Sequence, residues 1–211
     1  MKFGRKRQAQ QTAPEEVVEQ TVPQAGAVGP FDADEINAAE LVAAGEYIDL
    51  GSLLVPPVDG AELRMQVDEE SGAILSVMLL GEQGAMEMRA FAAPRTPGMW
   101  AEARGQIADE VRRQGGTAEE RDGAFGPELY IEQPVQTEDG EQLVQPSRVI
   151  GHEGPRWFLR VTFLGAPAVD AEHAQMWEDM LRQLAVRRGR EALPPGEALP
   201  LTLPDNAEPI D

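Results

Sequence analysis

Hydrophobic and polar residues alternate along much of the chain between residues 62 and 164, with the period of two that is typical of half-buried β-strands. The clearest case is 62–68, where Leu63, Met65 and Val67 alternate with polar neighbours. Short polar turns between such stretches favour antiparallel pairing. Residues 73–80 are apolar on both faces, which indicates a central strand. Together these patterns predict seven strands, over residues 62–68, 73–80, 85–93, 117–122, 128–135, 143–151 and 157–164.

Two other stretches have a helical period instead. Residues 97–114 place an apolar side chain every three or four positions, with Thr96 as the expected N-cap and Gly115 and Gly116 at the end. A second apolar stripe predicts a helix over 170–188. This order predicts an α+β fold, in which an antiparallel sheet of six or seven strands carries two main helices.

The two ends of the chain differ in composition from this expected domain. Residues 1–28 are rich in Gln, Ala and Pro and have little to bury, so we expect a disordered leader with a basic start. One domain is expected over 29–204, including segments that dock onto the core. Prolines predict an extended C-terminal tail whose last residues, 205–211, are frayed.

Charge narrows the range of partners. The chain has 18 basic and 37 acidic residues and a net charge of −19, so its body should repel duplex nucleic acid. The start carries four positive charges, which predict either weak contact with a polyanion or only a solubilising role. The longest uncharged apolar stretch, 71–81, is too short to span a bilayer, and no hydrophobic signal core follows the basic start. We therefore expect a cytoplasmic protein that is not transmembrane.

Searches for catalytic motifs return little. The sequence has no cysteine, no G-x-S-x-G and neither of the common nucleotide-binding glycine motifs. His152 and Glu153 begin like a zinc-protease motif, but its second histidine is replaced by Arg156. We expect no catalytic residue, metal or cofactor. The favoured function is a non-enzymatic binding or adaptor module with a protein partner, and an unrecognised enzyme is the less favoured alternative.

The remaining candidate chemistry is a set of arginines and aromatic residues near the predicted strands and the first helix. A helix N-terminus beside several arginines suits an anion, because backbone amides and guanidinium groups donate together. The predicted site takes a phosphate-bearing small molecule or a partner's acidic segment. The alternative is that the arginines pair with nearby acids while the tryptophans anchor the core. The predicted site residues are Arg89, Arg95, Trp100, Arg156 and Arg160.

Several runs of residues resemble an actinobacterial family classed as domain of unknown function 3710, across about residues 29–204 and at the basic start. This resemblance implies no activity. The family's genes tend to lie near that of dUTPase, which suggests an alternative role as a small-anion or nucleotide-binding protein in nucleotide or nucleic-acid metabolism. The order of elements is also similar to the Mog1 and PsbP sandwiches, which are binding folds. The family runs are Met1–Lys6, Gly29–Asp32, Tyr47–Leu53, Arg89–Arg95 with Gly98 and Trp100, and Gly154–Arg160.

Overall fold

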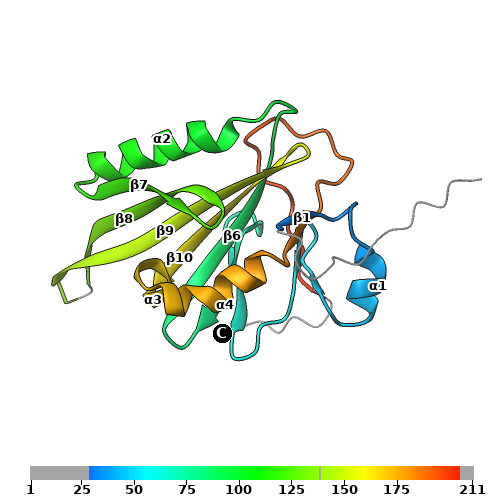
Figure 1. Cartoon of the computed structure of the whole chain (residues 1–211), viewed down its shortest axis with the longest axis horizontal. Coiled ribbons are helices and arrows are strands. Elements are labelled where there is room, and N and C mark those ends of the chain that lie inside the picture. Colours follow the sequence, from blue (N-terminus) through cyan, green and yellow to red (C-terminus); the bar gives the residue numbers. More distant parts are fainter. Residues whose placement is uncertain (1–28, 138, 205–211) are drawn as a thin grey trace, which may run out of the picture.

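Seven antiparallel strands form the main sheet of the computed structural model, which describes residues 29–137 and 139–204 (Figure 1). Their order across the sheet is β4-β5-β6-β10-β9-β8-β7. The predicted α+β class and strand number are confirmed. The disorder and fraying expected for 1–28 and 205–211 lie outside the described residues. The strands are β4 (Glu62–Val67), β5 (Ile74–Gly81), β6 (Gly84–Ala92), β7 (Thr117–Gly123), β8 (Gly126–Gln136), β9 (Gln142–Gly154) and β10 (Trp157–Gly165).

A second, small sheet of four short strands has the order β1-β11-β3-β2, and the alternation pattern does not predict it. Its strands come from distant parts of the chain, and β1 pairs in parallel with β11. Each is only two or three residues long, too short for a period to show. The strands of the small sheet, and the helix that follows its first strand in the chain, are β1 (Phe31–Asp32), α1 (Ala38–Ala43), β2 (Ile48–Asp49), β3 (Leu53–Val55) and β11 (Ala185–Val186).

The helix predicted over 170–188 is shorter than expected. The structure has α3 (Ala166–Val169) followed by α4 (Ala171–Leu181), which the Asp170 carboxylate caps by accepting hydrogen bonds from two backbone amides. The helix ends early because β11 bonds to both β1 and β3. Tertiary pairing therefore overrides a sequence that could continue as helix.

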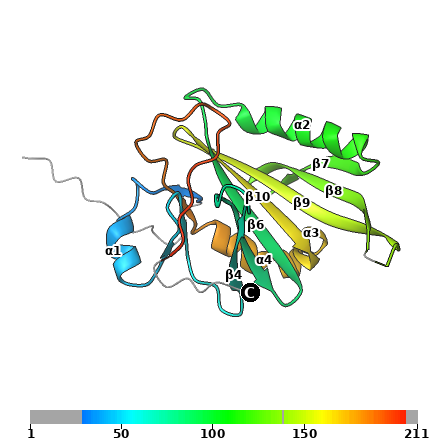
Figure 2. The same cartoon turned by 180° about the vertical axis from the view of Figure 1, so that it is seen from behind.

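The two faces of the main sheet are covered by different helices (Figures 1 and 2). On β10, Trp157, Val161 and Phe163 belong to the core that includes Trp177 and Leu181 of α4. The alternate residue Phe158 belongs to the core on the opposite face, under α2 (Met99–Arg113). Burying each of these large side chains contributes about 1.5–3 kcal/mol. The period of two on β10 thus separates two apolar layers.

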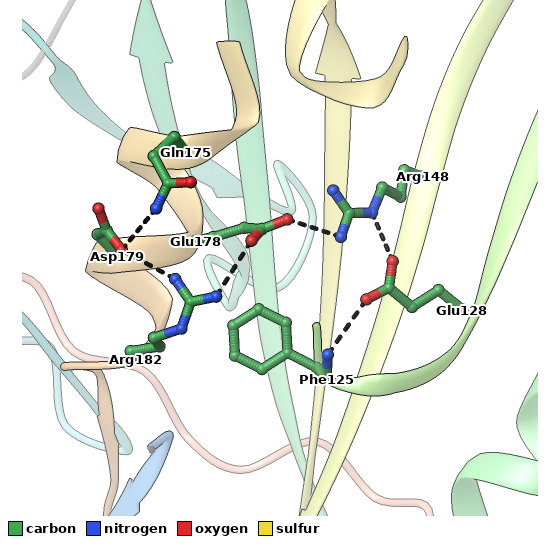
Figure 3. A network of polar contacts seen from close by, with 7 residues as sticks. All are labelled: Phe125, Glu128, Arg148, Gln175, Glu178, Asp179 and Arg182. Atoms are coloured by element: carbon green, nitrogen blue, oxygen red, sulfur yellow. Dashed lines mark hydrogen bonds and ion pairs between the residues drawn. The ribbon is translucent and has the colours of Figure 1, made fainter. Parts of the chain in front are cut away.

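A buried ionic network joins α4 to the neighbouring strands β8 and β9 (Figure 3). The Arg148 guanidinium donates to Glu128, which is completely buried, at 2.5 Å and to Glu178 at 2.8 Å. Arg182 of α4 holds the other oxygen of Glu178 at 3.2 Å. Burial lowers the pKa of Arg148, but the hydrogen bond and charge of Glu128 and the hydrogen bond to Glu178 outweigh it and raise that pKa overall. The network pairs each charge that it removes from water.

Candidate functional site

Arg89 and Arg160 stand directly opposite each other on β6 and β10. Both are half-buried on the α2 face of the sheet, where the alternation of each strand places them. Their guanidinium carbons lie 5.3 and 5.6 Å from the centroid of the same ring, that of Phe91. The ring in turn stacks on Phe158. Two predicted site residues are therefore brought together over an aromatic support.

Within residues 29–137 and 139–204, this arginine pair has no carboxylate partner. Fourteen arginines lie in the described part of the chain, and eight of them are within 4 Å of a carboxylate. All four predicted site arginines are among the other six, which are Arg89, Arg95, Arg156, Arg160, Arg188 and Arg190. Among the described residues, the predicted site arginines are therefore not paired with acids.

The pair is also poorly solvated. The Arg89 Nε atom is buried and has no hydrogen-bond partner among the described residues. Burial and the charge of Arg89 lower the pKa of Arg160, against an opposing effect of Glu87. Like charges directly opposite on neighbouring strands are destabilising, and an unsatisfied buried donor costs about 1–3 kcal/mol. An anion shared by the two guanidinium groups would relieve the repulsion between their charges.

Arg95 and Trp100 lie at a different place, in a groove of about 420 Å³. The buried Trp100 ring stacks on Phe158 with 5.9 Å between centroids, and its Nε1 donates to the Pro127 carbonyl at 2.7 Å. Trp100 is thus a core anchor that also forms one wall of the groove. The other lining residues are Ala93, Pro94, Pro97, Gly151, Glu153, Gly154 and Pro155.

The structure corrects two expectations for the first helix, that Thr96 caps it and that its first backbone amides are free. Helix α2 begins at Met99 after Gly98, whose φ is +129°, and Thr96 lies in the loop before it. The two carboxylate oxygens of Glu153 accept from the Gly98 and Trp100 amides at 2.8 and 2.7 Å. A carboxylate of the chain itself therefore occupies the helix N-terminus, because it satisfies donors that the backbone leaves free.

Arg156 lies in the turn between β9 and β10, exposed and with φ at +61°. Its carbonyl accepts from the Ala93 amide at 2.9 Å and from Arg188 Nε at 3.0 Å. Arg156 is therefore at the same end of the sheet as Arg95. The structure divides the five predicted residues into the Arg89–Arg160 pair on the sheet and the group of Arg95, Trp100 and Arg156 at its end.

Sequence reasoning missed three contributors, Phe91, Phe158 and Glu153. Phe91 and Phe158 each stand two residues from an arginine on the same strand, so the period of two places them on the same face and could have identified them as neighbours. Glu153 gives no such signal, because it is more than 50 residues away in the chain from the amides that it caps. Only the pairing of β9 with β10, and of β10 with β6, brings it there.

A larger groove of about 650 Å³ lies beside the small sheet. Arg187 donates there to both oxygens of Asp49, at 2.8 and 3.0 Å, and to the Gly51 carbonyl. The hydrogen bond from Arg187 lowers the pKa of Asp49 against the raising effect of burial. Since these charged groups satisfy one another, this groove is a weaker candidate. Over 29–137 and 139–204, no group of three or more acidic or histidine residues could hold a metal, and no helix is long and apolar enough to cross a membrane.

Comparison with known proteins identifies the family. The model of the family described as "Protein of unknown function (DUF3710)" matches residues 29–209, and the chain belongs to that family. No curated protein matches it. Among solved structures, the chain is similar to the solution structure of cyanobacterial PsbP (CyanoP) from Synechocystis sp. PCC 6803. The identity is 12% and the TM-score 0.36, with 67% of this chain and 93% of that chain covered.

Proposed function

We propose that this protein is a cytoplasmic, non-enzymatic binding module that holds an oxyanion between Arg89 and Arg160. The observation that carries the proposal is the opposition of these two arginines on β6 and β10, without a carboxylate partner in the described part of a chain of net charge −19. Two guanidinium groups offer several donors in a fixed geometry that suits carboxylate and phosphate oxygens.

The surroundings of the pair favour a partner protein as the source of the oxyanion. Small-molecule sites are generally concave and enclose most of their ligand. Arg89 and Arg160 instead stand on a strand face, and neither belongs to the two grooves described above. Both side chains are partly exposed on that face, where an acidic side chain of a partner can meet them. A phosphate-bearing metabolite supplies the same chemistry and is the alternative.

Calorimetric titration of the full chain at low ionic strength tests the proposal. One arm uses pyrophosphate, and the other uses an acidic peptide of ten residues with an amide-substituted peptide as its uncharged control. Charge-assisted hydrogen bonds are worth about 1.5–3 kcal/mol each, so Arg89→Gln with Arg160→Gln should weaken binding at least tenfold.

The matched control is Arg64→Gln with Arg121→Gln, which removes the same charge from two exposed arginines that are paired with glutamates on the same sheet. Tighter binding of the peptide supports the adaptor role, and tighter binding of pyrophosphate supports the metabolite. An equal loss of binding affinity in both double variants would show only a general attraction between charges and would contradict the proposal.

A further inference from the structure

Four arginines gather at the end of the sheet where β6 leads to α2 and β9 turns into β10. The Arg156 carbonyl accepts hydrogen bonds from Arg188 Nε and from the backbone amide of Ala93, which lies two residues before Arg95. Arg190 follows two residues after Arg188 and is exposed. Both cartoon views show the segment after β11 beside the β9–β10 turn and the loop before α2 (Figures 1 and 2).

None of these four arginines has a carboxylate within 4 Å among the described residues. Arg188 instead donates to two backbone carbonyls, those of Arg156 and Glu191. Among the carboxylates near this end, Glu191 and Glu197 are exposed, and the two oxygens of Glu153 accept from the amides of α2. The helix amides therefore offset the charge of Glu153. Among the described residues, the guanidinium groups of Arg95 and Arg156 have no carboxylate partner and can accept an external anion.

The groove beside these arginines has a different character. Trp100 and three prolines, Pro94, Pro97 and Pro155, provide apolar wall, and Arg95 also lines the groove while it is exposed to solvent. Arg156 directly follows Pro155. Such a surface offers contact to an aliphatic or aromatic side chain and, next to it, donors to a carboxylate.

We propose that this groove binds an extended segment of a partner protein in which an acidic residue stands close to a large apolar one. The apolar side chain would occupy the groove, and its acidic neighbour would pair with Arg95 and Arg156. A nucleic acid fits less well, because the net charge of −19 repels a long polyanion and the buried Trp100 ring is not free to stack on a base. This surface does not depend on the Arg89–Arg160 site.

Displayed random peptides of twelve residues can be selected for binding to the full chain, which identifies the preferred segment. We expect the enriched peptides to carry Asp or Glu within three residues of Leu, Ile, Phe or Trp. Enrichment of basic or uncharged peptides, or of none, would overturn the proposal. Amide resonances of Gly151, Gly154 and Arg95 report whether the enriched peptide occupies this groove.

Variants separate this surface from the oxyanion site. Arg95→Gln with Arg156→Gln should weaken the selected peptide at least tenfold, and Pro97→Glu should do so by adding a repulsive charge to the groove. Pro57→Glu is the matched control, since Pro57 is also exposed but lies between β3 and β4. Binding that is unchanged by the groove variants, or that falls equally in Arg89→Gln with Arg160→Gln, contradicts a separate surface.

Discussion

The indole nitrogen of Trp157 donates a hydrogen bond of 2.8 Å to the carboxylate of Asp32, which is 125 residues away in the chain. Both side chains are buried. The same carboxylate accepts from the Asp34 amide at 2.9 Å. This contact attaches β1 to the first residue of β10, and so joins the small sheet to the large one.

Replacing Trp157 tests this connection. Trp157→Phe removes the donor and leaves a buried carboxylate oxygen of Asp32 unsatisfied, which costs about 1–3 kcal/mol or more for a charged group. Trp177→Phe is the control, because Trp177 is also buried but has no indole hydrogen bond within the described residues. Urea denaturation should show a larger loss for Trp157→Phe, and equal losses would contradict the role of the hydrogen bond.

The Glu128–Arg148 pair gives a second prediction. Glu128→Gln leaves the buried Arg148 with half of its charge compensation, and breaking a buried pair costs about 3–5 kcal/mol. Replacing both residues by apolar ones of similar size, Glu128→Leu with Arg148→Met, removes the unpaired charge, and Glu178 keeps its contact with Arg182. The double variant should therefore be more stable than the single one in urea denaturation. The opposite order would show that the network stabilises through more than pairing.

Replacing glycine by alanine should have opposite effects on stability at Gly151 and at Gly105. A Cβ atom at Gly151 would lie 2.2 Å from the Trp100 ring, so Gly151→Ala must displace the wall of the groove and should cost about 1–3 kcal/mol. Gly105 is exposed inside α2 and has open space around its Cα, so Gly105→Ala should stabilise by up to about 1 kcal/mol. Thermal unfolding of both variants measures the contrast. A neutral Gly151→Ala would mean that Trp100 is not held against β9.

His152 predicts part of the pH dependence of stability. Burial lowers its pKa, and the charge of Glu153 opposes this only in part. Below the ordinary pKa of about 6.5 the unfolded chain takes up a proton that the folded one resists, so the free energy of unfolding falls as the solution becomes acidic. His152→Gln removes this contribution, and its stability should fall less between pH 7.5 and pH 5.5. Parallel curves for the two proteins would contradict the assignment.

The sequence predicts the large sheet well because each strand carries its own signal. The alternation on β4, β6 and β10 is visible within a few residues, and it places Arg89 and Arg160 each on a definite face of its strand. It does not give the register, which depends on pairing between strands about 70 residues apart. The sequence therefore does not predict that the two arginines lie directly opposite each other, as they do in the structure.

The errors at the two helices have the same physical origin. Thr96 is a good N-cap in isolation, but Glu153 from β9 supplies the cap that the fold uses. Residues 182–188 suit a helix, yet the β11 pairings are worth more in the folded protein. In both places a partner distant in sequence decides between local structures of similar propensity. A window of neighbouring residues does not contain that partner.

Two-dimensional NMR of the arginine Nε–Hε resonances shows whether an oxyanion binds between Arg89 and Arg160. The buried Nε of Arg89 should give a resolved signal, since it is shielded from exchange with water. At low ionic strength, pyrophosphate or the acidic peptide should shift the Arg89 and Arg160 signals in a saturable way and leave Arg64 unchanged. Signals of Arg89 and Arg160 that do not move, or that move in proportion to Arg64, would contradict an oxyanion site between the two strands.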